Sequence, residues 1–401
     1  MKTCEVQQME ELVDGTNDKF NNIDLLGIFR HTAKLTGLDC TACAAAKTGN
    51  GSKVLGAISQ ILSIAVIILM FVRAFTFLGE EGKILSFNWA ESNVFGFMGL
   101  HCVVCCFCVM GWTAHSFVPN YLKQLGQVRI LRVEPNEEID DYRGLRKKAF
   151  ILSLPWLGVM MFTALFNSLS EKILWSGAVV PSYKYSIFPA LAFLVWLITS
   201  TCLTFYALVQ FSMTREIEYF NDELQKASED KKLKEANVFS EFSFRQKELF
   251  KLVVKTNESL SSYARIAPLF CFFSIINIIY SLSFFTHVPL PYAISLIALL
   301  LNILGWTVLT LIPACKVQHQ LTTTAKILME SNEFESAEPK VFQTYRVMVD
   351  RSLKNDTRIF VLNAFGIDTT NFNVAMFAIP NLGPILMMLK KVLEANGVSV
   401  S

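Results

Sequence analysis

Seven long apolar blocks constrain this chain more than any other feature of its sequence. A helix needs about 20 residues to cross the roughly 30 Å hydrocarbon core of a bilayer, and each block has about this length. The predicted spans are Val54–Phe77, Val94–Val118, Ala149–Leu169, Tyr185–Met213, Ile266–Thr286, Leu290–Ala314 and Asn371–Leu389. Hydrophobic residues make up 52% of the 401 residues and charged residues only 17%, which is too little charge for a soluble protein of this size. The sequence therefore predicts an all-α membrane protein with seven transmembrane helices.

Lys and Arg are distributed unevenly between the segments that connect these spans. The N-terminal segment and the segments after spans two, four and six hold 30 of the 36 basic residues, and the segments on the other side hold five. Basic segments are retained in the cytosol. The count predicts a cytosolic N-terminus, an extracellular C-terminus and a multi-pass protein of the plasma membrane.

The segments after spans four and six carry apolar residues at helical spacing, and no Pro or Gly occurs between Met213 and Pro268. We expect spans four to six to continue as helices into the cytosol and to pack there as a layer; the alternative is a solvated helical hairpin. The predicted units are a cytosolic segment 1–53 with an amphipathic helix, spans one to four at 54–213, a cytosolic extension 214–265, spans five and six at 266–314, a cytosolic anchor segment 315–369, the last span at 370–390 and an extracellular tail 391–401.

The predicted spans contain no Asp or Glu, and Arg73 is their only Lys or Arg. Proton-coupled transporters and pumps usually need intramembrane carboxylates, and metal-dependent hydrolases need clustered ligands. No Gly-rich nucleotide motif occurs, and a net charge of +2 gives no general attraction to nucleic acid. The sequence thus favours neither an enzyme nor an active transporter, and it indicates no cofactor and no nucleic-acid partner.

A cluster of Cys residues with an adjacent His lies in the second predicted span. Its members are His101, Cys102, Cys105, Cys106 and Cys108. One interpretation is a metal or redox site. The favoured interpretation is that Cys serves as a small hydrophobic residue at helix contacts.

G-protein-coupled receptors are the most common class with seven helices, but the sequence disfavours that class. Their N-terminus is extracellular, which is opposite to the charge count here. The predicted outer loops contain no Cys, so they cannot form an extracellular disulfide. The last span reads Ile379-Pro380-Asn381-Leu382, not Asn-Pro-x-x-Tyr.

Three stretches of the chain are similar to a known superfamily. They are Leu25–Arg30 with Leu35–Leu38, the run that begins at Ala314-Cys315-Lys316, and Phe360–Asp368. With the seven spans, the cytosolic N-terminus and the long helical extensions, they resemble the insect gustatory and odorant receptor superfamily and its gustatory-receptor-like relatives in nematodes and other animals. The last span departs from that pattern, because it lacks the Thr-Tyr and Gln-Phe pairs typical of the superfamily. The chain therefore resembles a divergent, gustatory-receptor-like member.

The resemblance implies a ligand-gated cation channel that assembles as a homo- or heterotetramer through its cytosolic helices. The second half of the last span would line the pore, with Leu386 and Leu389 near the gate and Lys390 where the superfamily has Gln. A ring of Lys there would disfavour cations, unless these residues only pack and Lys390 reaches the interface. The resemblance implies a pocket for a small molecule in the outer half of each subunit, although light is an alternative stimulus. At this depth the residues with aromatic or polar tips are His101, Phe162, Phe166, Tyr185, Phe188, Phe193, Trp196, Tyr280 and Tyr292.

Two functions of different classes follow. The first is a chemosensory channel, of taste or another sense. The second is a non-conducting signalling or interaction subunit, which the altered last span favours. The sequence identifies neither the ligand nor the number of subunits.

Overall fold

The computed structural model describes residues 25, 29–40, 50–78, 87–132, 143–174, 183–285, 290–331, 334, 338–354, 358–361 and 365–396. Nearly all of these residues are helical. The helices are α3 (Phe29–Leu35), α5 (Asn50–Leu78), α6 (Phe87–Ala114), α7 (Phe117–Ile130), α8 (Arg143–Leu174), α9 (Tyr183–Glu229), the 3₁₀ turn η2 (Lys232–Lys234), α10 (Ala236–Phe284), α11 (Leu290–Glu330), α12 (Pro339–Leu353) and α13 (Thr369–Ala395). Two short strands, β1 (Phe360–Val361) and β2 (Phe365–Gly366), pair as an antiparallel hairpin.

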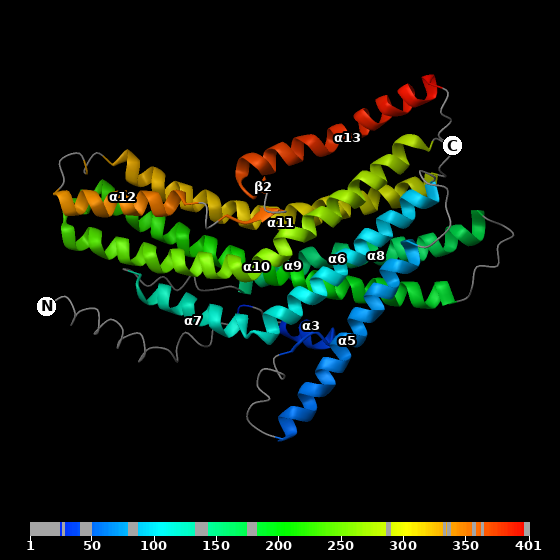
Figure 1. The fold of residues 1–401 in the computed structure, drawn as a ribbon, viewed down its shortest axis with the longest axis horizontal. Helices are drawn as coiled ribbons and strands as arrows, with labels where there is room; N and C mark the ends of the chain where they lie inside the picture. The colour runs from blue at the N-terminus through cyan, green and yellow to red at the C-terminus, as the bar shows by residue number, and fades with distance from the viewer. Residues whose placement is uncertain are drawn as a thin grey trace.

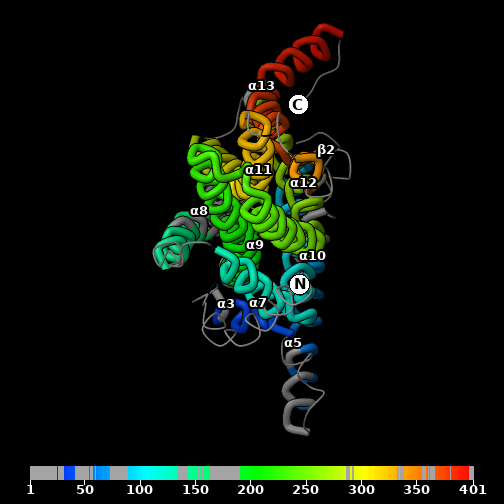
Figure 2. The backbone as a smooth tube through the Cα atoms, turned by 90° about the vertical axis from the view of Figure 1, so that its left-hand side faces the viewer, coloured from blue at the N-terminus to red at the C-terminus, as the bar shows by residue number. Residues whose placement is uncertain are grey.

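Three very long helices, α9, α10 and α11, form the centre of the molecule. They have 47, 49 and 41 residues, respectively, and Figure 1 shows them running side by side along the long axis, with α12 at one end. α6 packs against α10, and α8 packs against α9. In Figure 2, α5 and α13 extend from this core on opposite sides.

Each predicted span has a helix at its position. In the part of the chain that the structure describes, four helices are long and apolar enough to cross a membrane: Trp89–Ala114, Ala190–Glu229, Ala236–Phe284 and Ala293–Glu330. The two halves of α13, Thr369–Ile379 and Asn381–Ala395, meet at a bend of 41° and pass the same test when taken together. Pro380 lies at this bend, where it cannot donate a backbone hydrogen bond.

The second predicted span does not continue to Val118. α6 ends at Ala114 and α7 begins at Phe117, because Ser116 adopts a left-handed conformation with φ of 51°. The amide of Ser116 closes the end of α6 by donating to the carbonyl of Thr113. The prediction carried the span through to Phe117 and Val118, although the polar pair His115-Ser116 interrupts the apolar run and Pro119 follows in the first turn of α7.

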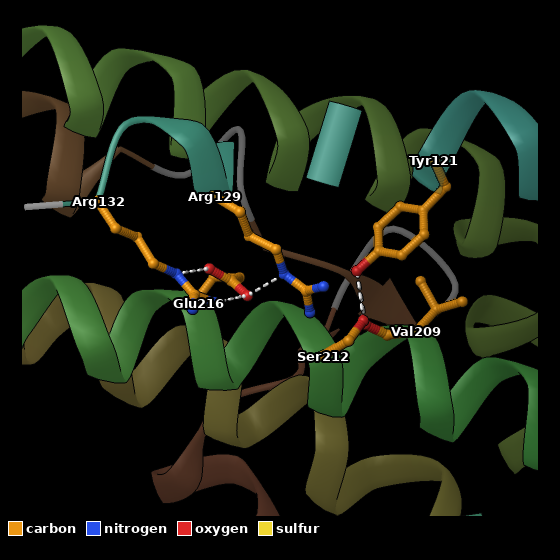
Figure 3. A network of polar contacts seen from close by, with 6 residues as sticks. All are labelled: Tyr121, Arg129, Arg132, Val209, Ser212 and Glu216. Atoms are coloured by element: carbon orange, nitrogen blue, oxygen red, sulfur yellow. Dashed lines mark hydrogen bonds and ion pairs between the residues drawn. The ribbon is translucent and has the colours of Figure 1, made fainter. Parts of the chain in front are cut away.

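α7 is fixed to α9 by charged and polar groups that are buried (Figure 3). Glu216 on α9 accepts from Nε of Arg129 at 2.9 Å and from Nη2 of Arg132 at 2.5 Å. One turn earlier on α9, Ser212 shares a hydrogen bond with the hydroxyl of Tyr121, which also donates to the carbonyl of Val209 at 3.2 Å. We call these contacts the α7–α9 clamp.

The predicted helical layer beyond spans four to six is present as a packed unit at the α12 end. Phe239, Leu249, Leu252 and Leu328 are buried, and polar side chains cross-link the helices. On α10, Gln246 donates from Nε2 to the carbonyl of Met348 on α12 at 2.9 Å. α9, α10 and α11 thus continue as helices past the predicted spans and pack there against one another and against α12.

The β1–β2 hairpin leads directly into α13. The amide of Ile367 donates to the carbonyl of Ile359 at 2.8 Å. Asp368 then caps α13 by accepting from the amide of Asn371 at 2.8 Å. The stretch Phe360–Asp368, which carried part of the resemblance, thus fixes where the last helix begins.

Candidate functional site

A cavity lies between four helices of the central bundle. Its walls come from α6, α9, α10 and α11. The lining residues are Met98, His101, Val195, Thr199, Phe270, Cys271, Ser274, Asn302, Ile303 and Trp306. The cavity is small and partly open, with about 30 Å³ of space for the centres of water-sized spheres. No charged side chain lines it, so the cavity is suited to an uncharged molecule.

Asn302 is the polar group of the cavity wall whose side-chain donor lacks a hydrogen-bond partner among the described residues. The residue is only 9% exposed, and the donor is its Nδ2. The hydroxyls of Thr199 and Ser274, in contrast, donate to carbonyls one turn earlier on their own helices. A buried amide donor without a partner costs about 1–3 kcal/mol. A molecule in the cavity that offers an acceptor atom would remove this cost.

Aromatic rings form one wall of the cavity and hold one another in place. The ring of His101 lies edge-on to that of Trp306, with centroids 5.4 Å apart and planes at 87°. Trp306 Nε1 donates to the hydroxyl of Tyr263 at 3.2 Å, and Tyr263 stacks obliquely against Tyr206 at 5.2 Å. Because its indole N–H is already bonded to the protein, Trp306 presents an apolar surface rather than a donor.

Of the nine residues predicted for the pocket, His101 lines this cavity. Phe162 and Phe193 are each 45% exposed. Trp196 is turned toward α8, where its Nε1 donates to the carbonyl of Ser153 at 2.9 Å. Tyr280 packs against Phe284 in a separate cluster near the end of α10, with ring centroids 4.4 Å apart. The side chains of Phe166, Tyr185, Phe188 and Tyr292 lie outside the described part of the structure.

The prediction missed Asn302, Thr199, Ser274 and Trp306. It was based on depth and aromatic character, and neither property determines which side of a helix faces a neighbour. One signal was available, because Asn302 is an amide within the apolar run Leu299–Gly305. A polar residue at such a position needs a partner or a cavity.

The cysteines of the second predicted span are buried in the helical core. Cys102, Cys105 and Cys106 are each 0% exposed, and the contact of Cys105 Sγ with His101 Nε2 is 3.8 Å long. Among the described residues, no group of three or more His, Cys, Asp or Glu side chains is placed to hold a metal ion. The packing matches the interpretation of these cysteines as small hydrophobic residues.

The three residues predicted for a pore lie on two faces of α13. Leu386 packs against the cluster of Tyr280 and Phe284 on α10, and Lys390 donates from Nζ to the carbonyl of Phe284 at 2.5 Å. Leu389 is 48% exposed. Within one subunit, Leu386 and Lys390 therefore lie on the face that contacts α10, and Leu389 lies beside it.

The sequence matches one protein family, and the fold is similar to that of a receptor of known structure. The sequence model of the family described as "Caenorhabditis protein of unknown function, DUF267" matches residues 25–383. No curated protein matches the sequence. The fold is similar to that of the insect olfactory receptor OR5 from Machilis hrabei in complex with eugenol, with a TM-score of 0.60 and 13% identity, over 90% of this chain and 100% of the receptor. A second structure of the same receptor gives a TM-score of 0.60 and 12% identity, over 91% of this chain and 99% of the receptor.

Proposed function

This chain belongs to the Caenorhabditis protein family of unknown function DUF267, and we propose that it is a chemosensory receptor that binds a small uncharged molecule and conducts cations when bound. The fold it shares with an insect olfactory receptor, over nearly the full length of both chains, supports a receptor rather than an enzyme. The observation that carries the proposal is the cavity around His101, Asn302 and Trp306.

The lining of the cavity indicates the chemistry of the ligand. Without charged side chains, it offers no compensation for the desolvation of an ion, which costs several kcal/mol. Trp306 and Phe270 provide an apolar surface, and Asn302 provides a buried donor. The ligand is therefore a compact, uncharged molecule with an apolar body and one acceptor such as an ether, hydroxyl or carbonyl oxygen. The structure of the olfactory receptor OR5, which has a similar fold, contains eugenol. Eugenol is uncharged and has an apolar body with oxygen acceptors.

The exposed surface supports a place in the membrane and an assembly of subunits. Along α5 and α13, large apolar side chains such as Ile61, Val72, Phe377 and Met388 are more than half exposed. A surface of this kind is covered by lipid or by another subunit. We propose a seven-span protein of the plasma membrane with a cytosolic N-terminus and an extracellular C-terminus. In this arrangement the α12 end forms the cytosolic contact between four subunits and α13 lines a central pore.

Replacing Asn302 with Leu tests the ligand site, because a ligand role and a structural role predict opposite signs. Asn302→Leu keeps the side-chain size and removes the unpartnered amide, so the unliganded protein should gain about 1 kcal/mol in free energy of unfolding. The affinity for eugenol, used as the probe, should fall about tenfold as one hydrogen bond is lost. Thermal unfolding and binding to the purified full chain in detergent measure the two effects.

Asn277→Leu is the matched control, since Asn277 is a half-buried Asn of α10 outside the cavity lining, and its Nδ2 donates to the carbonyl of Phe273 on the same helix at 2.8 Å. This change should leave eugenol binding unaltered. Loss of stability in Asn302→Leu with no change in binding would refute the proposed site.

Conduction is tested separately by expression in cells that lack related channels, with surface staining and recording of current or calcium. We expect a cation current that a neutral ligand of this class increases. Silence of a chain that is shown to reach the surface and to bind eugenol would favour the non-conducting subunit.

A further inference from the structure

Lys390 lies on the side of α13 that contacts α10. Leu386, Lys390 and Leu393 follow one another at intervals of four and three residues, so they share one helix face. Leu386 and Leu393 both pack against the Tyr280–Phe284 cluster of α10. Between them, Lys390 donates from Nζ to the main-chain carbonyl of Phe284 at 2.5 Å. Its side chain is 16% exposed.

The acceptor is a group that needs a partner from outside its own helix. Phe284 is the last residue of α10, and the carbonyls in the last turn of a helix have no partner within that helix. The end of α10 also carries the negative end of the helix dipole, which attracts an ammonium group. The ring of Phe284 lies 5.8 Å from Lys390 Nζ, and Glu394 Oε1 lies 3.9 Å from it. Lys390 thus caps the C-terminus of a neighbouring helix.

The opposite face of α13 carries no charge. Counting from Val374 at helical intervals, its residues are Val374, Phe377, Asn381, Ile385, Met388 and Val392. All six are exposed in the single subunit. A turn of about 100° per residue places this stripe on the far side of the helix from Lys390. We call it the outer stripe of α13.

We propose that Lys390 is a positioning residue that fastens the C-terminal half of α13 to the end of α10, and that its charge stays off the outer stripe. This proposal rests on the proposed function only for conduction. If α13 lines a pore with its outer stripe, the ammonium at position 390 does not form a ring of positive charge in the ion path. The lysine at this position is then compatible with cation conduction, and it controls how readily the second half of α13 moves.

Hydrogen exchange of the purified full chain tests the fastening without any need for current. Lys390→Met keeps most of the apolar stem and removes the donor. The backbone amides of residues 386–396 should then exchange about tenfold faster, as expected for the loss of one charge-assisted hydrogen bond. The amides of residues 371–378, before the bend, should be unchanged. Lys391→Met alters the adjacent, exposed lysine and should leave both segments as in the wild type.

Two more variants distinguish the loss of this hydrogen bond from a general folding defect. Lys390→Arg keeps a long cationic donor and should restore slow exchange, whereas Lys390→Gln should fall between Met and wild type. Equal exchange rates in Lys390→Met and Lys391→Met would overturn the proposal, as would failure of Lys390→Arg to protect residues 386–396.

Recording of current gives the second readout. Lys390→Met should raise the current without ligand and leave the ratio of cation to anion permeability unchanged. A rise in that ratio would mean that the ammonium faces the ions, which overturns the proposal. If no variant conducts but the exchange pattern is as expected, the proposed channel function fails and the role of Lys390 stands.

Discussion

α7 and α13 both pack on the outside of the central helices, and they are held in opposite ways. The α7–α9 clamp buries its charges almost completely, with side-chain exposures of 1% for Arg129, 5% for Arg132 and 1% for Glu216. The contact of α13 with α10 includes one cation, Lys390, which donates to the carbonyl of Phe284 on α10 and is 16% exposed. α7 is therefore held by buried charges whose separation is costly, whereas α13 is held on one face by apolar contacts, including the buried Ile379 of its first half, and by the hydrogen bond of Lys390.

This difference bears on the free energy needed to detach each helix from the central helices. Separating buried charges leaves each of them without compensation, so the clamp is all-or-none. α13 bends by 41° at Pro380 and has only its inner face in contact with the subunit. Elements that move in response to a ligand have few buried contacts of their own.

The largest expected effect is at Glu216. Glu216→Gln leaves two buried guanidinium groups without their carboxylate, so we expect a loss of about 3–5 kcal/mol in free energy of unfolding. Glu218→Gln is the matched control two residues along the same helix, because Glu218 is exposed and accepts from Gln320 Nε2 at 3.0 Å. Thermal unfolding of both variants in the same detergent provides the measurement. Similar midpoints of thermal unfolding for the two variants would show that the clamp is no stronger than a surface contact. The contrast between how α7 and α13 are held would then be wrong.

A smaller effect is expected at the hydroxyl of Tyr121. Tyr121→Phe removes the hydrogen bonds to Ser212 and to the carbonyl of Val209 and should cost about 1 kcal/mol. The two hydroxyls share one bond, so the double variant with Ser212→Ala should lose less than the sum of the single variants. Strict additivity would indicate that the two hydroxyls do not interact.

The sequence was sufficient to predict the helices but not how they face one another. The apolar blocks indicated where α9, α10 and α11 lie, and the absence of Pro and Gly after Met213 indicated that α9 continues. The prediction failed at Ser116, because mean hydropathy over a whole span outweighs a short polar interruption such as His115-Ser116. A break of this kind depends on local backbone geometry, which hydropathy does not report.

The cavity was harder to predict for a similar reason. Phe193 and Val195 lie two residues apart on α9, so their predicted depths in the membrane are almost the same. Phe193 is nevertheless 45% exposed, whereas Val195 is 2% exposed. Which of them faces the cavity is decided by the packing of α9 against its neighbours. Asn302 was the exception, because an amide within an apolar run points to a buried contact without knowledge of the packing.

The smallest effect on the fold of one subunit is expected on the outer stripe of α13. Met388 is 70% exposed, so Met388→Ala should change the free energy of unfolding of the subunit by less than about 0.5 kcal/mol. Leu386→Ala, on the face that contacts α10, should cost about 2 kcal/mol.

If identical subunits meet along the outer stripe, Met388→Ala should nonetheless weaken the oligomer, which size-exclusion chromatography with light scattering detects. The reverse order of stabilities would mean that the outer stripe, and not the face with Lys390, is the packed side of α13. In that event the lysine would belong to the open face, and its charge would have to be counted in any ion path.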